Sequence, residues 1–270
     1  MHSSSRNRNI YGTRITFACI SLFVLNVGRK ILWINNLMEV IILAGGLGTR
    51  LRSVVDKVPK CMAPVAGKPF LWYILKYLTR YNVTHVILSV GYLREVIYKW
   101  IDEVRNEFPF EFDYAVEKIP LGTGGGIRLA LQQSAANEVI ILNGDTFFDV
   151  NLIHLMEEHR RMDSSLTVAL KPMTEFDRYG AVEYSGDGRI MAFHEKAYCK
   201  QGLINGGVYV IDKLKLPMDN QPEKFSFESA VMEKQCQYGN LYGVVLNGYF
   251  RDIGVPEDYK QANDDFKTMF

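Results

Sequence analysis

The chain has 270 residues, a formal net charge of +1 and a hydrophobic fraction of 48%. This length is enough for one sizeable core, and the near-neutral charge argues against a nucleic-acid-binding protein, which would usually present a basic face. The four cysteines are scattered and form no CxxC pair. They therefore predict neither a disulfide framework nor a zinc site, and they indicate a reducing, cytoplasmic compartment.

The first 37 residues differ in composition from the rest of the chain. A start rich in Ser, Arg and Asn (1–14) precedes an apolar run (15–27), an order that resembles a signal peptide. The run is too short to span a membrane, and no cleavage site of the Ala-x-Ala kind follows it. Because the first core strand begins at Glu39, we favour Met38 as the natural start. Residues 1–37 are then an extension, disordered or not native, and no stable membrane insertion is expected; a membrane anchor is the alternative.

From Met38 to Leu170, apolar strands alternate with amphipathic helices. The predicted strands cover residues 40–43, 85–90, 111–116, 138–142 and 165–170. One helix begins at Pro69, and the others cover residues 94–108, 126–133 and 151–161. This alternation predicts right-handed βαβ units and a mainly parallel sheet, so the fold class is α/β.

After Leu170 the pattern changes to shorter, antiparallel elements. Residues 181–184 and 189–194 flank Ser185-Gly186-Asp187-Gly188, which is a hairpin signal. Further strands are predicted at 204–211, 241–246 and 249–252, and helices at 227–235 and from Pro256 onward. No linker separates the two parts, so we predict one domain, 38–270, with two halves, 38–170 and 171–270.

A glycine-rich loop follows the first strand. The loop and its flanks contain Leu43, Ala44, Gly45, Gly46, Gly48, Thr49, Arg50 and Lys60. Glycine lets backbone N–H groups approach a ligand closely, and successive N–H groups form an anion cradle. With cations beside it, the loop predicts a polyphosphate site. It matches neither a Walker A loop nor a dinucleotide fingerprint, because the other positions of both motifs are occupied by different residues.

Three further loops are expected beside the glycine loop. Ligands of open α/β sheets bind beyond the carboxyl ends of the parallel strands. This rule gathers the loops after Leu43, Val90, Val116 and Leu142 at one edge of the sheet. Residues 117–126 and Asn143-Gly144-Asp145 are then expected to face the same crevice as the glycine loop.

Six motifs in this order resemble the signature of sugar-1-phosphate nucleotidyltransferases. They are Leu43-Ala44-Gly45-Gly46-x-Gly48-Thr49-Arg50-Leu51 with Pro59-Lys60 and Pro64, then Pro120-Leu121-Gly122-Thr123, Asn143-Gly144-Asp145, Glu195-Lys196, Asn205-Gly206-Gly207 and Arg251-Asp252-Ile253-Gly254. The resemblance covers residues 38–266 and implies a three-layer Rossmann-like nucleotidyltransferase fold with a mainly parallel, mixed central sheet. It makes 38–170 the nucleotide-binding half and 171–270 the sugar-binding half. One departure is Cys61, where relatives often carry Pro, Gln or another residue.

The resemblance implies attack of a sugar 1-phosphate oxygen on the α-phosphorus of a nucleoside triphosphate, with release of pyrophosphate. Because both substrates are anionic, the site must neutralise charge and hold the reactants in line. The implied catalytic residues are Arg50, Lys60 and Asp145. The implied nucleotide-binding residues are Leu43, Ala44, Gly45, Gly46, Gly48, Thr49, Arg50, Glu117, Gly122, Thr123 and Asp145. The implied sugar-phosphate-binding residues are Gly180, Glu195, Lys196, Asn205 and Gly207. Asp145 and Asp252 are the implied ligands of Mg²⁺, a hard cation that prefers oxygen.

Each of these assignments has a simpler structural alternative. The alternatives are solvated loop cations for Arg50 and Lys60, a helix cap for Asp145 or Asp149, a turn acid for Asp252, pairing with Glu195 for Lys196, a β-bulge for Gly206-Gly207 and a plain turn for Tyr179-Gly180. His154 and His159 match no zinc motif and are predicted to be surface residues.

Glu117, at the end of the third predicted strand, bears on the choice of base. A carboxylate accepts hydrogen bonds from both N1–H and N2–H₂ of guanine, whereas uracil and thymine offer one N–H donor and cytosine N3 is itself an acceptor. Glu117 therefore favours GTP, provided that its side chain points inward. The alternative is a solvated acid at the strand end, beside Lys118.

Residues 87–92 and 120–126 resemble the branch of the family that acts on heptose 1-phosphates. The leading expectation is thus transfer of GMP from GTP to D-glycero-D-manno-heptose 1-phosphate, for cell-surface polysaccharide assembly. The alternatives are mannose 1-phosphate with GTP, a hexose 1-phosphate with UTP, CTP or dTTP, and a non-catalytic relative that senses nucleotide sugars. Such relatives tend to lose the cations or carboxylates that this chain keeps. The family also allows a homo-oligomer.

Overall fold

The computed structural model describes residues 37–46 and 58–270, which lie within one compact unit, Asn36–Phe270. The predicted site residues Gly48, Thr49 and Arg50 lie outside the described residues, and so does the N-terminal extension up to residue 36. Their roles stay predictions.

Four neighbouring strands of the central sheet run parallel. Their order is β6 (Glu138–Asn143), β1 (Met38–Leu43), β4 (Val83–Val90) and β5 (Glu111–Val116). β1 and β4 are rich in Val, Ile and Leu and are buried on both faces, as parallel strands between two helical layers require. The parallel part of the sheet forms where the sequence pattern predicts it.

The second half of the chain extends this sheet with strands of mixed direction. β11 (Cys199–Asp212) pairs antiparallel with β6, β8 (Leu166–Phe176) and β9 (Gly180–Tyr184). β9 forms a hairpin with β10 (Ile190–Lys196), and β12 (Leu241–Val245) lies parallel to β8. In the part of the chain that the structure describes, nine strands form this sheet, and the mixed α/β fold is confirmed.

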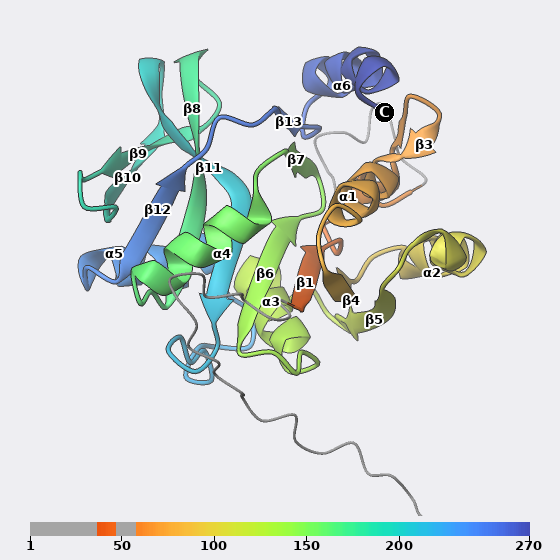
Figure 1. Ribbon diagram of the computed structural model, residues 1–270, viewed down its shortest axis with the longest axis horizontal. Coiled ribbons are helices and arrows are strands. Elements are labelled where there is room, and N and C mark those ends of the chain that lie inside the picture. Colours follow the sequence, from red (N-terminus) through yellow and green to blue (C-terminus); the bar gives the residue numbers. More distant parts are fainter. Residues whose placement is uncertain (1–36, 47–57) are drawn as a thin grey trace, which may run out of the picture. The chain divides into compact units, whose positions relative to one another are not determined.

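Helices cover both faces of the sheet, which gives three layers (Figure 1). One face carries α1 (Phe70–Leu78), α2 (Arg94–Val104), α4 (Leu152–Arg161) and α6 (Pro256–Met269). The other face carries α3 (Gly122–Leu131) and a helical segment made of η4 (Glu228–Met232) and α5 (Glu233–Gln237). β1 serves both layers, because Val40 and Ile42 belong to one buried cluster and Ile41 to the other.

The start of α4 decides one of the alternatives for the acidic residues. The side chain of Asn151 accepts a hydrogen bond from the backbone N–H of His154 at 3.1 Å and thereby caps the helix. Asp149 instead forms an ion pair with Arg80, with 2.9 Å between Oδ1 and Nη1. The helix-cap role for Asp145 or Asp149 is therefore wrong, and Asp145 keeps its carboxylate for other contacts.

The predicted elements differ from the observed ones where distant segments meet. α3 begins at Gly122 instead of residue 126, and the helix predicted for 94–108 ends at Val104 and continues as a 3-10 turn, η3 (Arg105–Glu107). β8 and β11 are longer than predicted because they pair with each other from Cys199↔Phe176 to Ile211↔Leu166. The periodicity also misses β7 (Thr146–Phe148), which pairs with β13 (Phe250–Asp252), and the short pair of β2 (Pro64–Val65) and β3 (Lys68–Pro69).

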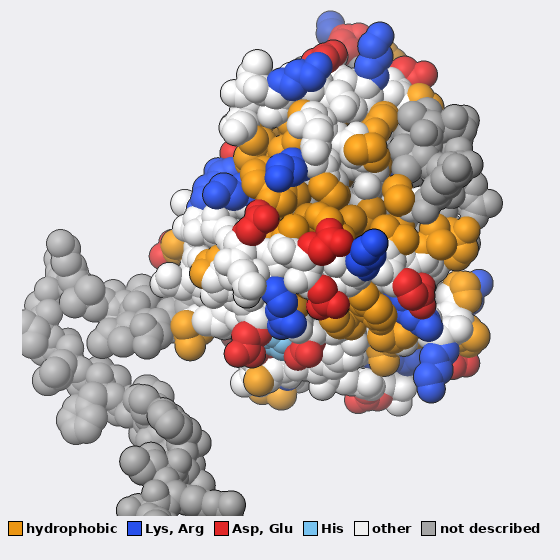
Figure 2. All heavy atoms as spheres, turned by 90° about the vertical axis from the view of Figure 1, so that its right-hand side faces the viewer, with side chains coloured by type: hydrophobic (Ala, Val, Ile, Leu, Met, Phe, Trp, Pro, Cys, Tyr) orange, Lys and Arg blue, Asp and Glu red, His pale blue; other side chains and the backbone are white. Residues whose placement is uncertain are grey.

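The surface beside α1, α2 and β5 carries mixed charges. Figure 2 shows Lys and Arg side chains interspersed with Asp and Glu on this face, with hydrophobic side chains gathered between them. This mixture fits the formal net charge of +1. Among residues 37–46 and 58–270, none of the helices has the length and apolar content that crossing a bilayer requires.

His159, predicted to lie on the surface, is buried in α4, with 1% of its surface exposed. That prediction is wrong, because the apolar face of α4 turns this residue toward β8. Its Nδ1 lies 2.8 Å from Thr167 Oγ1, and its Nε2 has no hydrogen-bond partner within the described structure. Burial lowers the pKa of His159 from 6.5 to about 4, and the nearby Asp212 carboxylate opposes this shift. His154, in contrast, is exposed as predicted.

The buried imidazole predicts a loss of stability in mild acid. Between its folded and unfolded pKa values the unfolded chain binds more protons, so the free energy of unfolding falls as the pH is lowered. We expect this one group to remove about 2 kcal/mol between about pH 7 and pH 5. Urea unfolding at both pH values measures the loss, and His159→Gln should reduce it. An equal pH dependence in the two proteins would contradict the assignment.

Candidate active site

A cavity of about 770 Å³ opens at the carboxyl ends of the parallel strands. Most of the predicted site residues that the structure describes line it, namely Leu43, Ala44, Gly45, Gly46, Lys60, Glu117, Gly122, Thr123, Asp145, Gly180, Lys196, Asn205, Gly207 and Asp252. Glu195 differs, because it is exposed and not part of the lining. The segments after Leu43, Val116 and Leu142 line the cavity as the strand-end rule predicts, and residues from the second half of the chain complete it.

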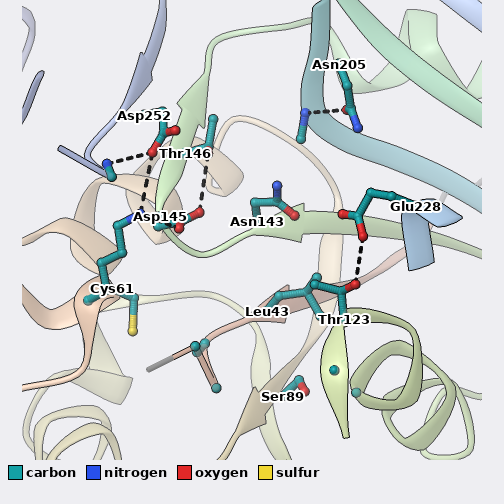
Figure 3. A pocket seen from close by; sticks show the side chains of 18 of the residues that line it. Leu43, Cys61, Ser89, Thr123, Asn143, Asp145, Thr146, Asn205, Glu228 and Asp252 are labelled. Carbon is teal, nitrogen blue, oxygen red and sulfur yellow. Dashed lines mark hydrogen bonds and ion pairs between the residues drawn. The ribbon is translucent and has the colours of Figure 1, made fainter. Parts of the chain in front are cut away.

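Two carboxylates and one lysine meet in this cavity (Figure 3). Asp145 lies in the turn between β6 and β7, directly before Thr146, and Asp252 ends β13. The pairing of β13 with β7 sets Asp252 opposite Thr146, and the backbone N–H of Ile253 donates to the backbone oxygen of Asp145 at 3.0 Å. Lys60 Nζ lies 2.5 Å from Asp145 Oδ2 and 3.5 Å from Asp252 Oδ1. One ammonium group thus contacts both acids.

Backbone and hydroxyl groups hold the two carboxylates in place. Thr146 Oγ1 donates to Asp145 Oδ1 at 3.3 Å, and the N–H of Gly254 donates to Asp252 Oδ1 at 2.7 Å. A Cβ at Gly254 would lie 2.8 Å from Asp252 Oδ1 and 3.0 Å from Lys60 Nζ, so only glycine leaves room for this arrangement.

The carboxylates of Asp145 and Asp252 also suit a hard divalent cation. Both acids lie within 3.5 Å of one nitrogen, so their oxygens converge on a position that already holds positive charge. Carboxylate oxygens are the protein ligands that Mg²⁺ prefers, and Mg²⁺ usually takes one or two of them together with phosphate and water. No cluster of three or more potential ligands occurs among the described residues, so the pair formed by Asp145 and Asp252 is the candidate.

Glu117 lines the cavity beside Gly45 and Gly126. Its Oε2 accepts from the backbone N–H of Leu121 at 3.0 Å, and its Oε1 accepts from Ser89 Oγ at 3.3 Å. A Cβ at Gly45 would lie 2.8 Å from Oε1, and one at Gly126 would lie 3.0 Å from it. The inward orientation that the base argument requires is therefore present, and the solvated-acid alternative does not describe this residue.

The glycines that begin α3 pack against another part of the protein. Gly122 has φ +74°, and a Cβ there would lie 2.5 Å from the backbone oxygen of Phe225. At Gly124 a Cβ would lie 2.2 Å from the Phe225 ring, and the N–H of Gly124 donates to the backbone oxygen of Phe225 at 3.1 Å. The segment around Phe225 thus explains why a glycine-rich stretch is helical here, against its low intrinsic propensity.

Glu228, three residues after Phe225, is a cavity residue that the sequence analysis misses. Its Oε2 accepts from Thr123 Oγ1 at 2.9 Å and from Ser226 Oγ at 2.8 Å. Figure 3 shows its carboxyl group directed into the cavity between Thr123 and Asn143. No motif marks Glu228, because its position depends on how the segment before η4 packs on α3.

Another part of the cavity wall is built around a bulge in β11. The register of β11 against β8 shifts between Asn205 and Tyr209. Asn205 Oδ1 accepts from the N–H of Gly207 at 2.9 Å, while its Nδ2 donates to Tyr209 Oη at 3.0 Å. Gly207 has φ +74°, and a Cβ there would lie 2.8 Å from Asn143 Nδ2. Gly207 is therefore both part of a bulge and part of the cavity wall.

Several other residues of the wall are not predicted as site residues. They are Cys61, Ser89, Thr146, Phe193, His194 and Phe250, whereas Pro120, Gly126 and Asn143 belong to segments predicted to face the crevice and Gly254 ends one of the six motifs. Thr146 follows Asn143-Gly144-Asp145 directly, so its place beside a site motif is the signal that could have found it. Tyr179 lines the cavity together with Gly180, which decides against the plain-turn alternative. Burial raises the pKa of the Cys61 thiol to about 12, so that thiol stays protonated.

Several known proteins match most of this chain in sequence or in structure. Proteins named D-glycero-alpha-D-manno-heptose 1-phosphate guanylyltransferase, from Aneurinibacillus thermoaerophilus and Campylobacter jejuni, are 45% and 44% identical to it. The alignments cover 85% and 82% of this chain and 99% and 97% of those proteins. HddC from Yersinia pseudotuberculosis, in a crystal structure complexed with GMP-PN, matches with a TM-score of 0.77 and 36% identity over 85% of this chain and 100% of that chain. The family described as nucleotidyl transferase matches residues 39–268, and the chain belongs to this family.

Proposed function

We propose that the protein transfers GMP from GTP to D-glycero-D-manno-heptose 1-phosphate and releases pyrophosphate. The contact of Lys60 with both Asp145 and Asp252, in one cavity with the glycine loop, is the observation that carries the proposal. The names of the relatives at 45% and 44% identity support the choice of GTP and of the heptose.

The reaction is a substitution at phosphorus. An oxygen of the sugar 1-phosphate forms a bond to the α-phosphorus of GTP, and the bond from this phosphorus to the bridging oxygen of the β-phosphate breaks. The main demand on the protein is positioning and charge neutralisation, so no covalent nucleophile is needed. Lys60 supplies a cation at the α-phosphate, and Arg50 supplies one for the leaving pyrophosphate.

Asp145 and Asp252 hold magnesium in this proposal. When bound, magnesium supplies positive charge to the phosphate oxygens at the reacting centre. The protein's own contribution is the fixed pair of carboxylates, which the pairing of β7 with β13 brings together.

Glu117 selects guanine in this proposal. Its two oxygens already accept from Leu121 N–H and Ser89 Oγ. Each carboxylate oxygen has a second lone pair, so the group can also accept from N1–H and N2–H₂ of guanine. The two protein donors fix the carboxylate beforehand, which lowers the entropy cost of binding the base.

In this proposal the sugar phosphate is bound by Lys196, Asn205 and Gly207. Glu228 accepts a hydrogen bond from a hydroxyl group of the sugar. Both hydrogen bonds to Glu228 end on Oε2, which leaves Oε1 for the ligand. Gly180 lines the same cavity, and a role of Glu195 in binding the sugar stays a prediction because this residue does not line the cavity.

The role of Glu228 predicts an effect on one substrate only. Glu228→Gln should raise KM for the sugar 1-phosphate about tenfold, because a hydrogen bond to a charged group is lost, and should leave KM for GTP unchanged. Glu233→Gln, on the neighbouring helix α5, removes the same charge outside the cavity and serves as the control. An equal rise in both KM values for Glu228→Gln would contradict the assignment.

A pyrophosphate-release assay tests the whole proposal. It combines GTP, UTP, CTP and dTTP with heptose, mannose and glucose 1-phosphates in the presence of magnesium. The highest kcat/KM is expected for GTP with the heptose phosphate. A higher kcat/KM with mannose 1-phosphate would make mannose 1-phosphate the proposed substrate instead. No turnover with any pair would overturn the enzymatic function.

The location and the assembly state extend the proposal. Cys61, Cys199 and Cys236 are free thiols, which fits a reducing, cytoplasmic compartment. A homo-oligomer stays a prediction, and size-exclusion chromatography with light scattering tests it.

A further inference from the structure

Lys60 has the longest side chain of the cluster that it forms with the two acids. The backbone of Asp145 is tied to Ile253, and the carboxylate of Asp252 accepts from Gly254 N–H. Lys60 lies in a short 3-10 turn, η2 (Lys60–Met62), and its ammonium sits at the end of a flexible four-carbon chain. Rotation of this side chain can move the ammonium while both carboxylates keep their hydrogen bonds from Thr146 and Gly254.

Lys60 Nζ and a metal ion would compete for the same carboxylate oxygens of Asp145 and Asp252. The side chain of Lys60 is 11% exposed, so water screens its charge only weakly. A magnesium ion sits about 2.1 Å from a carboxylate oxygen. With Nζ 2.5 Å from Asp145 Oδ2 and 3.5 Å from Asp252 Oδ1, an ion on these oxygens and the ammonium would face each other at short range and repel.

We propose that Lys60 prevents free divalent cations from binding to Asp145 and Asp252 until a nucleotide binds. The triphosphate offers Lys60 a new anionic partner, and the ammonium leaves the carboxylates for the phosphates. The carboxylates then receive the cation that the nucleotide carries. The protein therefore takes up metal and nucleotide together, as one complex, and binds metal alone poorly. This inference rests on the proposed metal role of Asp145 and Asp252.

Such an exchange leaves the two carboxylates with a cation beside them both before and after the nucleotide binds. Without nucleotide, one ammonium faces two carboxylates. With the metal–nucleotide complex, the divalent cation replaces it there, and the ammonium neutralises phosphate charge. A lysine suits this exchange because it is a compact point charge with rotatable donors, whereas the planar fork of arginine favours a fixed bidentate pair.

Binding of Mn²⁺ to the full-length chain tests the inference without any turnover. Electron paramagnetic resonance measures free Mn²⁺ in a titration with no nucleotide present. The unaltered protein should bind Mn²⁺ weakly, and Lys60→Met should bind it about tenfold more tightly or better. Lys196→Met is the matched control, since it removes one positive charge from the same cavity and should not change the affinity. Lys60→Gln repeats the measurement if Lys60→Met does not fold.

Two further arms separate the inference from the metal role on which it rests. The double variant with Lys60→Met and Asp145→Asn should lose the gain in affinity. Water-proton relaxation should detect protein-bound Mn²⁺ in the unaltered protein once GTP is added without sugar phosphate. Binding by Lys60→Met no tighter than that of the unaltered protein would overturn the inference. Undiminished binding of Mn²⁺ with GTP by Asp145→Asn would instead overturn the metal role itself.

Discussion

Replacement of Asp145 by Asn is expected to lower kcat for pyrophosphate release about a thousandfold. The variant loses the charge that faces Lys60 at 2.5 Å and, with it, one of the two proposed magnesium ligands. Its shape is nearly unchanged, and the backbone contact between Asp145 and Ile253 remains, so the fold should be preserved. Steady-state kinetics with saturating magnesium and a circular dichroism spectrum measure the two effects.

The control for this variant is Asp149→Asn, a few residues further along the chain. Asp149 pairs with Arg80 at 2.9 Å and does not line the cavity. Its replacement should leave kcat within about twofold, because surface ion pairs contribute little. Full activity of Asp145→Asn would refute its role as a metal ligand.

Replacement of Glu117 by Gln is expected to reduce kcat/KM for GTP about a hundredfold while the values for UTP, CTP and dTTP change little. The Leu121 N–H must keep an acceptor, so the amide oxygen of the new side chain takes the place of Oε2. The amide NH₂ then lies beside Ser89 Oγ, whose hydroxyl can accept as well as donate. A donor now faces guanine where an acceptor is required.

Glu111→Gln is the matched control for the base preference. Glu111 starts the same strand, β5, that Glu117 follows, and it is exposed at the opposite end of the sheet. It should leave the preference among triphosphates unchanged. An unaltered preference for GTP in Glu117→Gln would remove the argument that this carboxylate selects the base.

The local sequence pattern predicts the parallel half of the fold well and its long-range contacts poorly. The limits of β5 are as predicted, and Phe112, Tyr114 and Val116 follow the alternation that is typical of a strand. The start of α3 is not predicted, because its glycines become helical only when the segment around Phe225 packs against them. β7 is three residues long, and only its pairing with β13 makes it a strand.

The same distinction holds for the site. Lys60, Asp145 and Asp252 are found from their motifs, but their mutual contact depends on the pairing of β7 with β13. Glu228 has no motif, and Glu195 has one but does not line the cavity. His159 is ionisable, and ionisable residues usually lie at the surface. Only the packing of α4 on β8 shows that it is buried. Residue type and spacing give the candidates, and tertiary contacts decide among them.

The packing of residues 223–228 on α3 limits how the specificity of this enzyme can change. The segment holds the start of α3 through Phe225, and three residues later it delivers Glu228 to the proposed sugar end of the cavity. Glu117, the proposed reader of the base, is tied to the same helix start through Leu121 N–H. Substitutions that reshape this segment for another sugar should therefore also alter the choice of nucleotide.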